Sequence, residues 1–315
     1  MKTLILGGTG FVGRSVCAAL VERSGGSGDS IVVPTRRIGH ARDIQMLPTL
    51  VTVEADVHDD TSLAGLLDRC DAVVNLVAIL HGSEAEFKRT HIDLPRRLAA
   101  ACLVAKVRRV VHVSALGAHP SAPSLYLRSK AAGEAALVSP ALDVTVLRPS
   151  VIFGEHDRFL NLFAQLQSLF PVMPLGGAAA RFQPVWVEDV ARAIVHCLDE
   201  PATAGKTFEC AGPTVYSLEE LVRLAGRWSG HERPVFALPG ALARLQAAAL
   251  ELMPGPTLMS RDNIESMKVP NVATGQLPGL DALGISAKPL ESIAPVYLGK
   301  GYGLERLDTF RARRS

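Results

Sequence analysis

Short apolar runs alternate with longer segments of helical spacing through the first half of this 315-residue chain. Most of the runs are apolar at successive positions, which is typical of parallel strands buried on both faces. Between them, apolar residues recur every three or four positions, as on one face of a helix. The predicted strands are residues 2–6, 31–34, 51–57, 71–78, 108–114 and a sixth run that ends at Pro149. The alternation predicts an α/β fold, a doubly wound parallel sheet that binds ligands at the carboxyl ends of its strands.

The pattern becomes less regular after Pro149. A helix is predicted over residues 158–170, and another follows the capping-box sequence that begins at Ser217. A third, over residues 241–253, is rich in alanine and leucine. Ordinary core is favoured for this third helix over the wall of an apolar substrate pocket or an interfacial helix.

These patterns predict two parts. Residues 1–212 are expected to form a Rossmann-type nucleotide-binding domain, with residues 155–181 contributing to a substrate lobe. Residues 213–315 are expected to form a smaller, mostly helical substrate or lid region.

Composition narrows the function classes. With 48% hydrophobic residues, 20% charged residues and a net charge of +2, the chain is typical of a globular protein and gives no reason to expect nucleic acid. No apolar stretch approaches a membrane span, and the N-terminus does not read as a signal peptide. The five cysteines have no metal-site spacing and indicate reduced thiols, so we expect no metal and a cytoplasmic protein. The arginine-rich segment 304–315 is expected to be a solvated end, with weak contact to anionic lipid or a partner as the alternative.

A glycine-rich turn separates the first predicted strand from the helix that follows it. Gly8, Gly10 and Gly13 satisfy G-x-G-x-x-G, and Gly7, Gly10 and Gly13 satisfy the wider G-x-x-G-x-x-G. Glycine avoids Cβ clashes in such a turn, lets the backbone approach a pyrophosphate and allows close packing of helix on strand. The phosphates would lie at the N-terminus of the new helix. The turn therefore predicts a dinucleotide site, with a tight turn that binds no ligand as the alternative.

Two arginines follow the second predicted strand, where an NAD site usually has an acidic residue for the ribose 2′-hydroxyl. Arg36 and Arg37 instead suit a 2′-phosphate. The sequence therefore favours NADP(H), with NAD(H) as the alternative cofactor; a solvated basic loop is the other interpretation of the pair.

Ser114, Tyr126 and Lys130 form the candidate catalytic set. Ser114 ends its predicted strand at the ligand-facing edge, and Tyr126 and Lys130 lie four residues apart on one helical face. A nearby ammonium is expected to lower the tyrosine pKa from about 10. Tyr126 could then transfer a proton while Ser114 donates a hydrogen bond to a substrate oxygen. His91, on the apolar stripe of the preceding helix, is more often structural than catalytic.

These motifs resemble the short-chain dehydrogenase/reductase superfamily in its atypical or extended branch, the proteins similar to NAD-dependent epimerases and dehydratases. The resemblance covers residues 1–215. It is carried by Gly7, Gly10, Gly13, the Asp56-Val57 pair, the Ser114, Tyr126 and Lys130 set, and Leu147–Gly154.

Four further segments resemble a narrower group, the NADPH-binding accessory subunit of respiratory complex I and its free-standing bacterial relatives. These segments are residues 114–118, 126–130, 157–161 and 181–187. Extended members usually carry an asparagine about where His91 stands, so the resemblance gives His91 no proton-relay role. The segment between Ser114 and Tyr126 is shorter than in sugar-nucleotide epimerases, which disfavours a nucleotide-sugar substrate.

The resemblance implies a cofactor site along the ends of several strands. Its expected residues are Gly7, Thr9, Gly10, Phe11, Val12, Gly13, Arg36, Arg37, Asp56, Val57, Leu76, Val77, Ala78, Lys130, Pro149 and Ile152. The expected activity is hydride transfer between NADP(H) and a carbonyl or alcohol of a small substrate, hydrophobic or quinone-related.

Two other functions stay open. One is a non-catalytic NADPH-binding accessory or assembly protein of a respiratory or quinone-pathway complex. Such a protein would be peripheral at the inner membrane face. The other is a sugar-nucleotide epimerase or dehydratase.

Overall fold

The computed structural model describes residues 1–252 and 258–299, and its contacts divide the chain into two discontinuous compact units. The first unit contains residues 1–149, 187–210 and 273–286, and the second contains 150–186, 211–272 and the remainder from 287. The predicted contacts of segment 304–315 lie outside the described residues.

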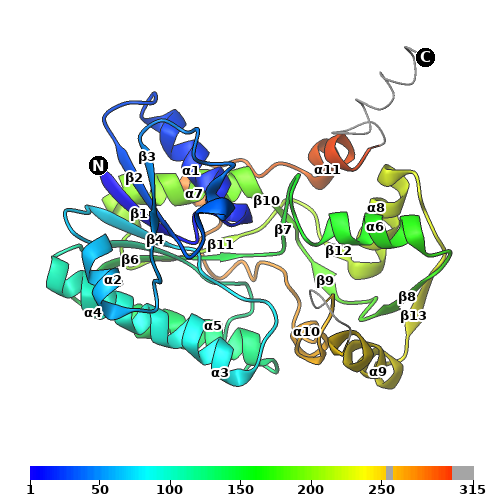
Figure 1. The fold of residues 1–315 in the computed structure, drawn as a ribbon. Coiled ribbons are helices and arrows are strands. Elements are labelled where there is room, and N and C mark those ends of the chain that lie inside the picture. Colours follow the sequence, from blue (N-terminus) through cyan, green and yellow to red (C-terminus); the bar gives the residue numbers. More distant parts are fainter. Residues whose placement is uncertain (253–257, 300–315) are drawn as a thin grey trace, which may run out of the picture. The chain divides into compact units, whose positions relative to one another are not determined.

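The first unit is built on a seven-stranded parallel sheet in the order β11-β6-β5-β4-β1-β2-β3 (Figure 1). All six predicted strands are present, and the predicted doubly wound α/β fold is confirmed. The elements are β1 (Lys2–Leu6), α1 (Phe11–Arg23), β2 (Ser30–Thr35), η1 (Ile38–Ala41), β3 (Leu50–Glu54), α2 (Asp60–Leu66), β4 (Ala72–Asn75), α3 (Glu84–Phe87), the π-helical turn η2 (Lys88–Asp93), α4 (Leu94–Ala105), β5 (Arg109–Val113), α5 (Leu125–Leu137), β6 (Asp143–Pro149), α7 (Val187–Asp199), η3 (Pro201–Thr203), β11 (Thr207–Cys210) and η4 (Leu280–Leu283).

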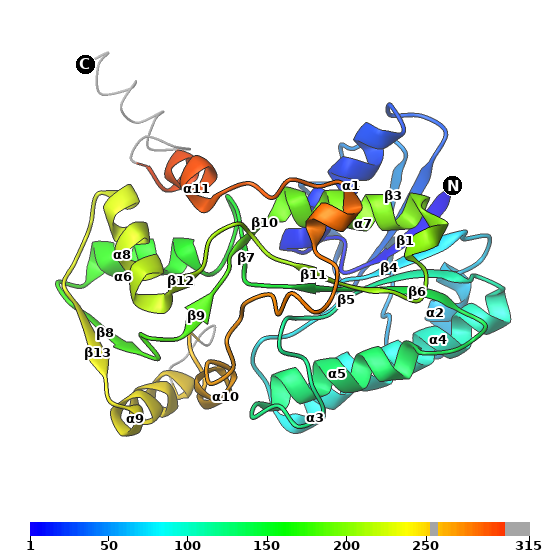
Figure 2. The ribbon, with the colours of Figure 1, turned by 180° about the vertical axis from the view of Figure 1, so that it is seen from behind.

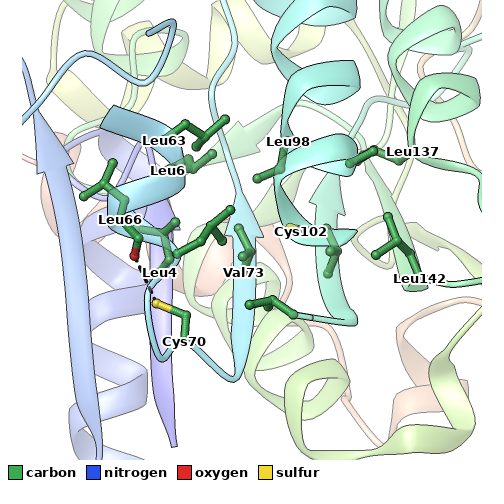
Figure 3. Close-up of a cluster of buried hydrophobic side chains, with 14 of the residues drawn as sticks. Leu4, Leu6, Leu63, Leu66, Cys70, Val73, Leu98, Cys102, Leu137 and Leu142 are labelled. Carbon is green, nitrogen blue, oxygen red and sulfur yellow. Dashed lines mark hydrogen bonds between the residues drawn. The ribbon is translucent and has the colours of Figure 1, made fainter. Parts of the chain in front are cut away.

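Helices cover both faces of this sheet, as the apolar strands require. On one face, Leu4 and Val73 pack against α2, α4 and α5 in a cluster that includes Leu98 and Leu137 (Figure 3). The opposite face carries α1 and α7, seen from behind in Figure 2. Because all strands are parallel, their carboxyl ends meet at one edge, and this edge carries the candidate site.

The second unit has its own apolar core, formed largely by α6, α8 and α11. Its elements are β7 (Ile152–Phe153), α6 (Leu160–Leu169), β8 (Met173–Gly176), β9 (Arg181–Phe182), β10 (Val185–Trp186), β12 (Tyr216–Ser217), α8 (Leu218–Ser229), β13 (Val235–Leu238), α9 (Gly240–Glu251), α10 (Arg261–Ser266) and α11 (Leu290–Leu298). The predicted capping box is confirmed, because Ser217 and Glu220 bond each other's backbone N–H groups at the start of α8. The helix expected from residue 158 begins at Leu160, after the buried Asp157 accepts hydrogen bonds from three backbone N–H groups of its first turn.

Helix α9 differs in part from its predicted environment. We expected ordinary core for this helix. It buries Ala243 and Ala247 against Ile264, whereas Leu242 and Leu245 of the helix and Leu252 at its C-cap are 51%, 66% and 87% exposed. Small side chains suit the buried face because β8 lies close to it: a Cβ on Gly176 would lie 2.8 Å from the Ala243 Cβ. The expectation of ordinary core therefore holds for the alanine face of α9 and not for its exposed leucines. No helix within residues 1–252 or 258–299 has the length and apolar composition that a bilayer crossing requires.

Candidate functional site

The glycine turn follows β1 and leads directly into α1, as predicted. Gly7 has φ of +84°, and its carbonyl accepts a 3.0 Å hydrogen bond from the Gly10 N–H. A Cβ on Gly13 would lie 2.3 Å from the Gly7 oxygen, so Gly13 is required for packing of the helix on the turn. Gly10 is exposed, and a Cβ there would meet only that oxygen, at 3.2 Å. Gly10 therefore leaves open space in which another group can approach the backbone.

Helix α1 begins without a side-chain cap. Gly10 occupies the N-cap position, and the described residues place neither a capping side chain nor an acidic residue in the first turn. Thr9, Phe11 and Val12 lie in this turn. The first N–H groups of a helix need partners, and its dipole favours an anion there. The turn fits a pyrophosphate for these two reasons.

The two arginines after β2 are presented to solvent on an ordered turn. The Thr35 hydroxyl donates to the Arg37 carbonyl oxygen at 3.0 Å and accepts from the Arg37 N–H at 3.4 Å. Arg36 and Arg37 are exposed, and within the described chain neither guanidinium has a hydrogen-bond or ion-pair partner. Two free guanidiniums on a fixed turn can bind a phosphate dianion.

Other predicted cofactor residues line the same edge of the sheet. Asp56 and Val57 follow β3, and Asp56 accepts from the His58 N–H at 3.0 Å and lies 3.7 Å from the Arg89 guanidinium. Leu76, Val77 and Ala78 follow β4, and Pro149 ends β6. Ile152 lies in β7, in the second unit, and is thus the one predicted cofactor residue outside the first unit.

The candidate catalytic residues come from β5 and α5. Ser114 follows β5, where its N–H donates to the Leu147 carbonyl oxygen of β6 at 2.7 Å. Helix α5 is capped by the Ser124 hydroxyl and carries Tyr126 and Lys130 one turn apart. The buried Lys130 ammonium donates to the Val113 carbonyl oxygen at 2.8 Å, beside Ser114 in the chain. The structure therefore joins α5 to the end of β5 through Lys130.

Burial dominates the titration of both α5 residues. It raises the pKa of Tyr126 to about 12, so the expected lowering of this pKa by Lys130 was wrong. Burial also lowers the pKa of Lys130 from 10.5 to about 8, although the Glu134 charge acts in the opposite direction. At neutral pH the site therefore holds a neutral phenol and an ammonium.

His91 makes two hydrogen bonds within the first unit. Its Nε2 accepts from the Ile79 N–H at 3.1 Å, so the proton is on Nδ1, which donates to the Ser129 hydroxyl at 2.8 Å. Ser129 in turn donates to the Tyr126 carbonyl oxygen at 2.7 Å. Burial, assisted by the Lys130 charge, lowers the pKa of His91 to about 3. The imidazole stays neutral and ties the loop after β4 to α5.

Sequence reasoning missed a second buried pair, Asn75 of β4 and His112 of β5. The Asn75 amide nitrogen lies 3.2 Å from His112 Nδ1, and the side chains are 1% and 2% exposed. The available signal was a polar residue directly after two valines of each strand, Asn75 after Val73-Val74 and His112 after Val110-Val111. No group of three or more His, Cys, Asp or Glu side chains in the described parts of the chain could hold a metal ion.

The chain is similar in sequence to several known proteins. The chain is 34% identical over 298 residues to the mitochondrial NADH dehydrogenase [ubiquinone] 1 alpha subcomplex subunit 9 of Mus musculus, covering 91% of this chain and 77% of that protein. It is 29% identical over 181 residues to 4-hydroxy-2-methyl-3-oxo-4-farnesyl-3,4-dihydroquinoline-1-oxide ketoreductase of Stigmatella aurantiaca, covering 50% and 52% of the two chains.

The fold is shared with enzymes of known structure. The UDP-glucose 4-epimerase of Thermotoga maritima superposes with a TM-score of 0.72 at 17% identity, covering 98% of this chain and 100% of that one. At this identity the likeness establishes the fold alone. Residues 3–211, which contain the glycine turn, Ser114, Tyr126 and Lys130, match the model of the NAD dependent epimerase/dehydratase family. The chain therefore belongs to this family.

Proposed function

We propose that this protein binds NADP(H) and reduces a carbonyl group of an apolar, ketone- or quinone-like substrate. The observation that carries the proposal is that Lys130, one turn after Tyr126 on α5, bonds the Val113 carbonyl oxygen next to Ser114. The same edge of the sheet carries the uncapped helix α1 and two free arginines. When bound, the nicotinamide supplies the hydride. The chain's own residues bind the dinucleotide, hold the substrate oxygen and deliver a proton to it.

NADP(H) is favoured over NAD(H) by charge. Arg36 and Arg37 lie on the turn that Thr35 fixes, and neither guanidinium forms an ion pair with a carboxylate among the described residues. A 2′-phosphate would neutralise them, whereas an unmodified ribose would leave both unpaired. We expect NADPH to bind at least about tenfold more tightly than NADH, or about 1.4 kcal/mol.

The proton transfer is assigned to Tyr126. The phenol is protonated at neutral pH, as any tyrosine near its ordinary pKa of about 10 would be, and burial raises this pKa further. It can therefore donate a proton to an oxygen that gains negative charge when hydride arrives. Ser114 holds that oxygen by a hydrogen bond. The Lys130 ammonium remains charged below a pH of about 8 and stabilises the phenolate that proton transfer leaves behind.

The apolar substrate class is supported by one relative. The Stigmatella aurantiaca protein is named a ketoreductase of a farnesylated dihydroquinoline oxide, and it matches half of this chain. The substrate named for this relative carries a carbonyl on a prenylated ring, and we propose a substrate of this chemical class.

The second candidate is an accessory protein that holds NADPH without turnover. The observation in its favour is the 34% identity to the Mus musculus protein, named as a subunit of NADH dehydrogenase. Its partner would be a respiratory complex, which the protein would contact peripherally.

Single-turnover oxidation of bound NADPH distinguishes the reductase from the accessory protein. Native mass spectrometry first identifies any nucleotide on the purified protein, and ketones, aldehydes and quinones are then added while absorbance is followed. For an enzyme, Tyr126→Phe lowers turnover by about two to four orders of magnitude with nearly unchanged NADPH affinity. Lys130→Met lowers both the turnover and the affinity for NADPH. Oxidation no faster than in buffer with every substrate would reject the reductase and leave the accessory protein.

A further inference from the structure

Two buried polar atoms at the end of β5 lack a hydrogen-bond partner among the described residues. They are Nε2 of His112 and Oγ of Ser114, whose side chains are 2% and 4% exposed. Alternate residues of a strand point to the same face of a sheet, so both share the face of Val110, which packs in the cluster with α4 and α5. Buried polar atoms are rarely left unbonded, so the pair requires an explanation.

The hydrogen bonds around Asn75 determine which His112 nitrogen carries the proton. The Val77 N–H donates to Asn75 Oδ1 at 3.2 Å, which leaves the Asn75 NH₂ group facing His112 Nδ1. The opposite amide orientation would place the NH₂ group against the Val77 N–H. His112 Nδ1 is therefore an acceptor, and the proton is on Nε2.

This imidazole is neutral and aims a single N–H into the interior. Burial, then the charge of Lys130 and then His91 lower the pKa of His112 well below its usual value. The Lys130 ammonium has three donors, one of which bonds the carbonyl oxygen of Val113, the residue between His112 and Ser114. His112, Ser114 and the Lys130 ammonium are thus all buried around Val113 at the end of β5, where His112 Nε2 and Ser114 Oγ have no hydrogen-bond partner among the described residues.

We propose that one buried water molecule is bound between His112 Nε2, Lys130 Nζ and Ser114 Oγ. Its oxygen accepts from the two nitrogens, and one of its protons is donated to Ser114. Buried waters typically make about three hydrogen bonds to groups that otherwise lack partners, which is the number these atoms provide.

The water determines in which direction the Ser114 hydroxyl donates its proton. A hydroxyl has one proton to donate and two lone pairs to accept. With a lone pair occupied by the water on its inner side, Ser114 keeps its own proton for an acceptor at the edge of the sheet. In the proposed reaction, on which this step alone rests, that acceptor is the substrate carbonyl oxygen. His112 is then a positioning residue for Ser114.

A high-resolution crystal structure of the full chain tests the water directly. Density for one water within hydrogen-bond distance of His112 Nε2, Lys130 Nζ and Ser114 Oγ supports the proposal. An empty region, or a direct bond between Nε2 and Oγ, overturns it. His112→Leu should lose the water, and His112→Gln, whose amide retains a donor, should keep it.

Turnover at saturating NADPH tests the positioning role. His112→Leu should lower the turnover number about tenfold, because the hydroxyl is present but no longer directed. NADPH affinity should stay within about twofold, and His112→Gln should restore most of the rate. Unchanged turnover in a folded His112→Leu variant that has lost the water would overturn the positioning role. If the unmutated protein turns over no carbonyl, the proposed function fails, and the crystal structure still decides the water.

Discussion

The buried ammonium of Lys130 leads to a quantitative prediction about stability. Burial lowers its pKa from 10.5 to about 8, and each pKa unit corresponds to about 1.36 kcal/mol. Holding this side chain charged in the folded protein therefore costs about 3 kcal/mol at neutral pH. Two interactions offset part of the free-energy cost of burying this charge. They are the 2.8 Å hydrogen bond to the Val113 carbonyl oxygen and the charge of Glu134.

The sign of the pH dependence follows from the two pKa values. Below about pH 8 both the folded and unfolded chains keep the proton, and the cost is present in full. Between about pH 8 and 10.5 the unfolded chain binds more protons than the folded one, so the contribution of Lys130 to the free energy of unfolding rises with pH. Above 10.5 both states are neutral and the cost has disappeared.

Urea unfolding of the unmutated protein and of Lys130→Met from pH 7 to 10.5 measures this effect. Other groups also titrate in this range; for example, burial raises the pKa of Cys17 and Cys102 to about 12. Subtracting the variant's curve removes their contribution. The difference should rise by about 3 kcal/mol across the window, while Lys206→Met, a change at an exposed lysine, should give no such rise. A flat difference for Lys130→Met would refute the burial argument.

The remaining predictions concern glycines and the cofactor. Gly10→Val should abolish NADPH binding, measured by calorimetry, because the new side chain fills the space in which the pyrophosphate approaches the backbone. The circular dichroism spectrum should be unchanged, because the new Cβ meets only one backbone oxygen, at 3.2 Å. Normal NADPH binding would show that the turn has only a structural role. Gly13→Ala and Gly133→Ala, whose Cβ atoms would lie 2.3 and 2.0 Å from backbone oxygens, should each lower the free energy of unfolding by about 1–3 kcal/mol. Gly65→Ala, in open space, is the control, and equal stability of all three variants would contradict the packing argument. Arg36→Ala should lower the ratio of NADPH affinity to NADH affinity, mainly because NADPH binds more weakly to the variant. Equal affinities for the two nucleotides in the unmutated protein would refute the argument that the arginines bind a 2′-phosphate.

Local patterns were enough to predict the sheet and the glycine turn. Apolar runs define buried strands without reference to the rest of the chain, and the steric demand on Gly13 arises from Gly7 and Gly8, within a few residues. The seventh strand, β11, was not predicted: it has only four residues, and Glu209 breaks its apolar run. The helix expected to carry His91 is also interrupted by the π-helical turn η2, which contains this residue.

Contacts between distant residues set the rest of the site. His91 and Ser129 are 38 positions apart, and Asn75 and His112 are 37 apart, so neither hydrogen bond has a local signature. The lysine–tyrosine spacing on α5 was predictable, but its effect on the tyrosine pKa was not. That effect depends on how deeply the folded chain buries the phenol.

The burial of Tyr126 also bears on the direction of the proposed reaction. With a pKa of about 12, only about one phenol in 10⁵ is ionised at pH 7. Alcohol oxidation needs the phenolate as a base, whereas carbonyl reduction needs the phenol as an acid. The buried tyrosine is therefore prepared for reduction, which agrees with the arginines that favour NADPH. An accessory protein would need the same dinucleotide cradle but would place no demand on the protonation of Tyr126. Single-turnover oxidation of NADPH that is lost in Tyr126→Phe would therefore distinguish the reductase from the accessory protein.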